Sequence, residues 1–208
     1  MDVGLEQLTT LLYKMGEVAK KTMDLSIRGF MTGKDCTEDV REFSDILVSM
    51  TAEIEEKSFG LIVKFQPVAS DLRIINSYMK IAYDFERYGR YAWDISDTYK
   101  KLGGIDNFAE PSAIMSQLAK EVSEMVRNSV EALRQNNPEL AKALAEKETK
   151  LDRLFLKYMD QLTSTPSVTK EAVRSLLLAR FLERIADHTT YVGESVVYIA
   201  TGEKVVLR

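Results

Sequence analysis

One stretch decides how this chain folds: Ala179-Arg-Phe-Leu-Glu183-Arg-Ile-Ala-Asp187-His-Thr-Thr-Tyr-Val-Gly-Glu194. Glu183 and Asp187 are four residues apart, so they lie on one face of a helix, and Glu194 follows two turns later. Small residues recur every seven positions beside these acids: Ala179, Ala186 and Gly193. Glycine in mid-helix costs about 1 kcal/mol relative to alanine, and the close approach of a second helix offsets that cost. The stretch therefore predicts a long helix packed closely against another helix, with acids beside the contact.

Helical periodicity continues through the rest of the chain. Near the N-terminus, Leu8, Leu12 and Met15 follow the three- and four-residue spacing of an amphipathic helix. Prolines at 67, 138 and 166 lie in turn-forming segments that interrupt the pattern. We expect helices over residues 5–30, 37–65, 70–102, 112–133, 139–162 and 168–200. No segment alternates with a period of two, so the sequence predicts an all-α fold.

The two halves of the chain resemble each other. Gly103, Gly104 and Pro111 cluster in one segment, and we expect the boundary between the halves there. Laying Glu86 on Glu183 brings three small residues of the first half, Ala82, Gly89 and Ser96, onto Ala179, Ala186 and Gly193. This register indicates an internal duplication. We expect two tandem antiparallel three-helix bundles, residues 1–104 and 105–208.

Composition narrows the class of protein. Of the 208 residues, 45% are hydrophobic, and the formal net charge of -4 argues against nucleic acid as the main partner. Cys36 is the one cysteine, which excludes a disulfide or a thiolate zinc site within the chain. No apolar run approaches the ~20 residues needed to span a bilayer, and the N-terminal residues lack a signal-peptide pattern. We therefore expect a cytoplasmic protein that does not insert into a membrane.

Two pairs of acids in the second half are candidate metal ligands. Glu148 and Asp152 lie on its middle helix, and Glu183 and Asp187 lie on its last helix. Glu194, two turns further along the last helix, is a fifth candidate ligand. If these helices are antiparallel neighbours, the four carboxylates come together and repel one another, and a bound cation turns that repulsion into attraction. Oxygen ligands suit Mg, Mn, Fe or Ca, and Zn less well.

Two other interpretations of these acids remain open. With 32 acids in the chain, such pairs also arise by chance, and the second half is then a metal-free interaction module. A carboxylate-bridged di-metal oxidoreductase would need Glu-x-x-His motifs, yet His188 is the one histidine and Ile185 stands three residues before it. We expect His188 on the helix surface or behind a metal ligand. Because a phosphate-binding glycine loop is also missing, we expect a protein that is not an enzyme.

The matching site in the first half has changed. Glu86 and Asp97 remain as counterparts of Glu183 and Glu194, but Arg90 stands at the second acid's position, where it could pair with Glu86. Ser44 and Val48 occupy roughly the positions of the other acid pair. We therefore expect the metal site in the second half, with Glu86 and Asp97 as a remnant.

Several motifs resemble the PhoU family of phosphate-signalling regulators. They are Gln66-Pro-Val-Ala-Ser-Asp71-Leu-Arg with Lys80-Ile-Ala-Tyr-Asp-Phe-Glu86-Arg-Tyr-Gly, and Leu182-Glu183-Arg-Ile-Ala-Asp187-His188 in the second copy. The resemblance implies two bundles related by a pseudo-twofold axis, which we expect to form a homodimer. It implies a negative regulator of phosphate uptake that links the ATPase or permease of a phosphate ABC transporter to a sensor histidine kinase. It also implies a site for divalent or trivalent metal ions (Fe, Mn, Mg or Zn), whose ligands map onto Glu148, Asp152, Glu183 and Asp187.

Overall fold

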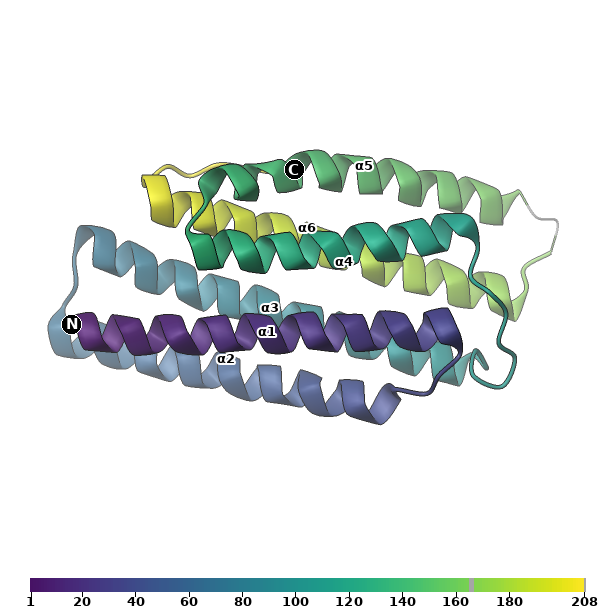
Figure 1. Cartoon of the computed structure of the whole chain (residues 1–208), viewed down its shortest axis with the longest axis horizontal. Coiled ribbons are helices and arrows are strands. Elements are labelled where there is room, and N and C mark those ends of the chain that lie inside the picture. Colours follow the sequence, from purple (N-terminus) through teal and green to yellow (C-terminus); the bar gives the residue numbers. More distant parts are fainter. Residues whose placement is uncertain (165–166, 208) are drawn as a thin grey trace.

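A computed structural model describes residues 1–164 and 167–207. The described residues form long helices and no strand, which confirms the all-α prediction (Figure 1). The helices are α1 (Asp2–Thr32), α2 (Thr37–Phe65), α3 (Ala69–Lys101), α4 (Ala113–Gln135), α5 (Pro138–Thr163) and α6 (Lys170–Thr201). Pro166, expected to help end the fifth helix, lies outside the described residues. None of the described helices combines the length and the low polarity that a membrane span requires.

Side-chain caps and turn residues place the helix ends. Ser112 accepts a hydrogen bond from the Met115 backbone N–H at the start of α4, and Thr169 does the same for Ala172 at the start of α6. These caps satisfy amide groups that the first turn of a helix leaves unpaired. At the C-terminus of α1, Gly33 has φ 71°, the left-handed conformation that glycine adopts most easily.

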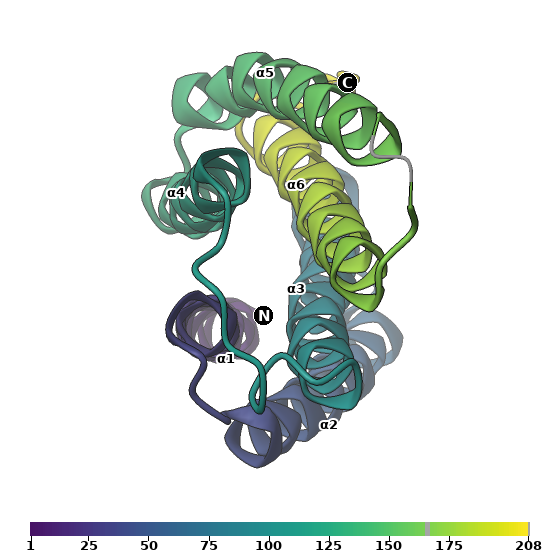
Figure 2. The ribbon, with the colours of Figure 1, turned by 90° about the vertical axis from the view of Figure 1, so that its right-hand side faces the viewer.

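The helices form two antiparallel groups of three. Helices α1, α2 and α3 pack together, as do α4, α5 and α6. The groups meet through an extensive contact between α3 and α6 and a smaller one between α1 and α4 (Figure 2). Exchanging α1 with α4 and α3 with α6 reproduces both contacts, as a pseudo-twofold axis requires. The structure thus has the predicted pair of three-helix bundles, while the exact boundary between residues 104 and 105 stays a prediction.

The small residues lie where helices pack closely, as the sequence predicted. A Cβ atom added at Gly89 would lie 2.5 Å from Leu47 Cδ1 and 3.4 Å from Ser44 Cα, both on α2. A Cβ atom at Gly193 would lie 3.0 Å from the backbone oxygen of Ala141 on α5. Gly89 therefore marks the α2–α3 contact in one bundle, and Gly193 marks the α5–α6 contact in the other.

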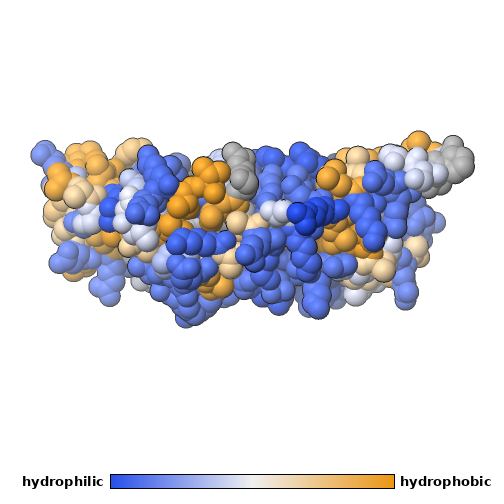
Figure 3. All heavy atoms as spheres, turned by 90° about the horizontal axis from the view of Figure 1, so that it is seen from above, coloured by the Kyte–Doolittle hydropathy of each residue, from blue (hydrophilic) through white to orange (hydrophobic). Residues whose placement is uncertain are grey.

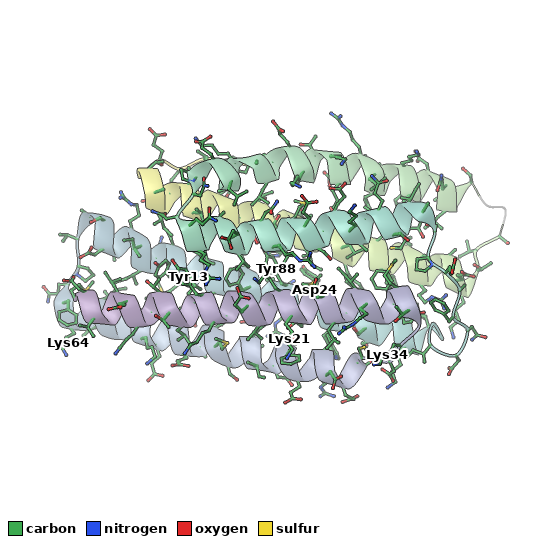
Figure 4. All side chains as sticks on the ribbon, viewed as in Figure 1. Tyr13, Lys21, Asp24, Lys34, Lys64 and Tyr88 are labelled. Atoms are coloured by element: carbon green, nitrogen blue, oxygen red, sulfur yellow. The ribbon has the colours of Figure 1, made fainter. Side chains whose placement is uncertain are left out.

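The space between the bundles is filled by apolar side chains with a few polar ties. Tyr88 of α3 is fully buried, and its hydroxyl lies 3.0 Å from Ser129 Oγ of α4. On the outside, Arg127 of α4 pairs with Asp24 of α1 at 3.0 Å. Tyr88 and Asp24 are both labelled in Figure 4. The buried apolar side chains of the two bundles form one continuous core. The surface differs from it: Figure 3, which views the molecule from above, shows separate apolar patches among mainly hydrophilic residues.

Candidate metal centre

The packing of α5 against α6 buries two of the predicted acids. On α5, Glu148 belongs to the row of residues that faces α6, and it is only 7% exposed. On α6, Glu183 is 9% exposed. Asp152 and Asp187 lie one turn further along their helices and are partly buried. A carboxylate removed from water in this way is costly unless it is neutralised or paired.

The pKa values of the acids show that they share one environment. Burial raises the pKa of Glu183 to about 7, and the charge of Asp187 adds to the effect. Burial also raises the pKa of Glu148, followed by the charges of Asp152 and Asp187. The pKa of Asp152 rises through burial and through the charge of Asp187. Because acids of α5 and α6 influence one another across the helix contact, the structure brings these four predicted residues together.

Arginines of α6 neutralise part of this charge. Arg180 Nη1 lies 2.7 Å from Glu183 Oε1, and Arg184 Nη1 lies 2.9 Å from Asp187 Oδ2. The second carboxylate oxygen of Glu183, Oε2, is buried and has no hydrogen-bond partner. An acceptor of this kind costs about 1–3 kcal/mol until it finds a partner. Glu183 therefore has one oxygen that is satisfied by Arg180 and one that is not.

The acids are not arranged as a completed metal site. Across residues 1–164 and 167–207, no group of three or more His, Cys, Asp or Glu side chains has an arrangement that could hold a metal ion. The donor chemistry nevertheless fits a hard or borderline cation, since the crowded ligands are carboxylates and Glu183 Oε2 lacks a partner. The residues fit such an ion in type, and their side chains would have to turn to bind it.

Glu194 lies elsewhere. Its Oε1 accepts a hydrogen bond from the backbone N–H of Leu207 at 3.0 Å. Burial raises the pKa of Asp84 on α3, and the charge of Glu194 adds a smaller contribution. It lines a cavity of about 530 Å³ together with Asp84 and Lys204. The structure therefore places Glu194 with α3 and the C-terminal segment, apart from the four acids.

The first-bundle remnant is neutralised by basic side chains. Arg90 Nε donates to Glu86 Oε1 at 2.7 Å, which confirms the expected ion pair. Asp97 pairs with Lys101 at 2.8 Å. Each acid has a basic partner one turn away on the same helix, so neither needs a metal ion for neutralisation.

His188 does not lie on the helix surface, which was one of the two positions expected for it. It is 5% exposed, and its Nδ1 lies 2.8 Å from Asp84 Oδ1 on α3. A position behind a metal ligand, the other expectation, stays a prediction. His188 is buried because α6 packs against α3, α4 and α5, so most of its circumference is covered. A signal existed in the residues after His188, where Glu194 is the one charged residue between 189 and 202; such a stretch predicts a helix buried on more than one side.

The chain is similar to known proteins over nearly its whole length. The family model for the PhoU domain matches residues 12–98 and 115–196. A phosphate-specific transport system accessory protein PhoU homolog from Clostridium acetobutylicum is 32% identical over 207 residues, covering 97% of this chain and 94% of the relative. Homolog 1 from Methanothermobacter thermautotrophicus is 28% identical and covers 96% and 94%.

Two crystal structures share the fold. PhoU from Pseudomonas aeruginosa matches with a TM-score of 0.88 at 24% identity, covering 97% of this chain and 99% of that one. The phosphate transport system regulatory protein PhoU from Streptococcus pneumoniae matches with a TM-score of 0.75 at 20% identity, covering 98% of both chains. Both likenesses extend over nearly all of the two bundles.

Proposed function

Because this chain belongs to the PhoU domain family, we propose that it is a non-enzymatic negative regulator of phosphate uptake. The observation that carries the proposal is that the family model matches both bundles and that the matched relatives are named accessory proteins of phosphate-specific transport. The regulator acts in the cytoplasm as a homodimer. It links the ATPase or permease of a phosphate ABC transporter to a sensor histidine kinase and restrains both when phosphate is plentiful.

The acids between α5 and α6 supply the metal-binding part of this proposal. The residues that would hold a divalent or trivalent ion (Fe, Mn, Mg or Zn) are Glu183, whose Oε2 is unpartnered, and Glu148, Asp152 and Asp187. To serve as a ligand, Asp187 would have to give up its pairing with Arg184. A bound ion would remove the mutual repulsion among these carboxylates. Burial is the main cause of the raised pKa values of Glu148, Asp152 and Glu183, and the charges of the neighbouring acids add to it. The ion holds α5 against α6 and shapes the surface that a partner contacts.

A deletion strain and a pull-down test the regulatory role. We expect phosphate uptake to stay high in phosphate-replete cells when the gene is deleted, and the tagged protein to recover transporter or kinase subunits. The matched control is the same strain carrying the gene on a plasmid, in which repression returns. Normal repression in the deletion strain, together with a pull-down free of transporter and kinase, would overturn the role.

Metal analysis tests the site separately. Protein purified without a nickel column is compared with a Glu183→Ala/Asp187→Ala variant. The control is Glu38→Ala/Glu42→Ala, which removes two acids at the same spacing from an exposed face of α2. We expect bound metal in the unaltered protein and the control, and little in the first variant. Equal and negligible metal in all three favours a metal-free interaction module, while the regulatory role is decided by the deletion strain.

A further inference from the structure

A second polar cavity lies between α2 and α3 of the first bundle. Its volume is about 370 Å³, and its lining includes Arg41 and Ser44 of α2 and Arg87, Arg90 and Trp93 of α3. Neither the acid motifs nor the proposed function accounts for it. Three arginines and an indole N–H in one cavity form a set of hydrogen-bond donors.

This cavity occupies the position that the acidic face holds in the other bundle. The buried row of α2 contains Thr37, Val40, Ser44 and Leu47, and the buried row of α5 contains Ala141, Leu144, Glu148 and Leu151 at identical spacing. Ser44 is therefore the counterpart of Glu148. On α3, Arg90 is the counterpart of Asp187 in the register that lays Glu86 on Glu183. At these two positions the first bundle therefore has the Ser44 hydroxyl and the Arg90 guanidinium, where the second bundle has carboxylates.

Two donors in the cavity wall lack a partner. Arg87 Nε and Trp93 Nε1 are both buried and make no hydrogen bond. The guanidinium of Arg87 is held in place by a hydrogen bond from Nη2 to the Tyr91 hydroxyl, which leaves Nε without an acceptor. A buried N–H without an acceptor costs about 1–3 kcal/mol. The acidic face of the other bundle shows the reverse, since an acceptor oxygen there, Glu183 Oε2, lacks a donor.

The charges of the lining favour an anion. Arg41, Arg87 and Arg90 face two carboxylates, Asp45 and Asp94, in the lining. Arg90 also pairs with Glu86, but through Nε, so its terminal nitrogens remain available. Burial raises the pKa of Asp94, and that favours its neutral form. The lining is therefore rich in donors and carries more positive than negative side chains.

We propose that this cavity binds a phosphate-type oxyanion. The hydrogen-bond donors of the cavity come from two helices, and there are more of them than the two oxygens of a carboxylate ligand could accept from. A tetrahedral oxyanion has oxygens that point in several directions, so it can accept from donors on both helices. Arginine binds such anions well, because its planar fork donates two parallel hydrogen bonds to two oxygens. The two bundles then differ at equivalent places: the α5–α6 contact is rich in hydrogen-bond acceptors, and the α2–α3 cavity is rich in hydrogen-bond donors. The inference does not depend on the proposed function.

Trp93 allows a direct test, since it is the single tryptophan of the chain. Its intrinsic fluorescence is followed while inorganic phosphate is added at constant ionic strength in the presence of EDTA, and calorimetry records the heat of binding. Chloride replaces phosphate in the control titration. We expect a saturable change with phosphate and none with chloride. A change of the same size with chloride, or no saturable signal by either method, would overturn the proposal.

Variants locate the binding site. Arg41→Gln and Arg87→Gln should each weaken phosphate binding about tenfold, as the loss of a charge-assisted hydrogen bond implies. Arg28→Gln removes the same charge from an exposed position of α1 outside the cavity and should leave binding unchanged. Circular dichroism confirms folding, and Arg41 is exposed, so its variant keeps the test valid if Arg87→Gln unfolds. Unchanged affinity in both cavity variants contradicts the proposal.

A further variant separates this site from the acidic face. Glu183→Gln/Asp187→Asn removes the proposed metal ligands and should leave the phosphate response intact. Loss of the response in that variant would place the anion on the other bundle and overturn the proposal.

Discussion

His188 Nδ1 lies 2.8 Å from Asp84 Oδ1 at the contact between α6 and α3, and both side chains are buried. In the register that lays Glu86 on Glu183, Asp84 corresponds to Phe181 and His188 corresponds to Tyr91. The rings of Tyr91 and Phe181 stack at 6.3 Å. The two contacts are therefore equivalent under the pseudo-twofold axis, one polar and one aromatic. The polar one joins the two bundles through a buried pair of titratable side chains.

Removing one member of this pair should destabilise the protein strongly. His188→Ala leaves Asp84 buried without its partner, and breaking a buried pair in this way costs about 3–5 kcal/mol. Urea denaturation followed by circular dichroism measures the loss. The double variant Asp84→Leu/His188→Phe replaces the pair by apolar groups and should recover much of the stability. A His188→Ala variant that loses under about 0.5 kcal/mol, the usual range of surface substitutions, would contradict this prediction.

Stability of the metal-free protein should fall as the pH rises toward neutrality. The ordinary pKa of Glu183 is 4.5, and burial raises it to about 7 in the folded protein, with a further contribution from Asp187. Between these values the folded protein keeps a proton that the unfolded chain has released, so folding is favoured less as the pH increases. Above pH 7 the buried charge costs on the order of 3 kcal/mol.

Urea denaturation in EDTA at about pH 5 and about pH 8 measures this effect. Glu183→Gln should flatten the profile, because glutamine has the same shape and does not titrate. Glu146→Gln, at an exposed position of α5, should leave the profile unchanged. A profile as steep in Glu183→Gln as in the unaltered protein would show that Glu183 is not responsible.

Glycine substitutions should separate close packing from helix propensity. Gly193→Ala places a Cβ atom 3.0 Å from the backbone oxygen of Ala141, which moves only with its helix. We expect a loss of about 1–3 kcal/mol, as is typical of overpacking. Gly60→Ala meets no atom within 4 Å, so it should stabilise the protein by about 0.5–1 kcal/mol. Thermal unfolding measures both, and a stabilising Gly193→Ala would contradict the close contact of α5 and α6.

Metal affinity should increase when the competing arginines are removed. Arg180 and Arg184 pair with Glu183 and Asp187, and each pair contributes up to about 1 kcal/mol that a metal ion must replace. Arg184→Gln should therefore tighten Mn²⁺ binding about two- to fivefold in a calorimetric titration. Arg153→Gln removes an exposed arginine of α5 and serves as the control. Equal gains in both variants would indicate a general charge effect.

Much of the fold follows from local pattern. The expected helix limits differ from the observed ones by only a few residues, because capping groups and prolines act on their own neighbours. Gly89 and Gly193 were correctly predicted to face neighbouring helices, since a glycine in mid-helix needs such a contact. Spacing also predicted that Glu148 and Asp152 share one helix face and that Glu183 and Asp187 share another, because side chains four residues apart along a helix lie on one face. The contact between α5 and α6 then brings the two pairs together.

Local sequence patterns thus predict the helices, the duplication and the acid pairs of the second bundle. Packing between helices is needed to learn that His188 is buried against Asp84 and that Glu194 lies with the C-terminal segment. The same holds for the unpaired donors of Arg87 and Trp93. The physical reason is that helical periodicity arises from residues three or four positions apart. Contacts between helices depend instead on how far one helix is shifted and rotated against another, which side-chain packing over the whole interface decides.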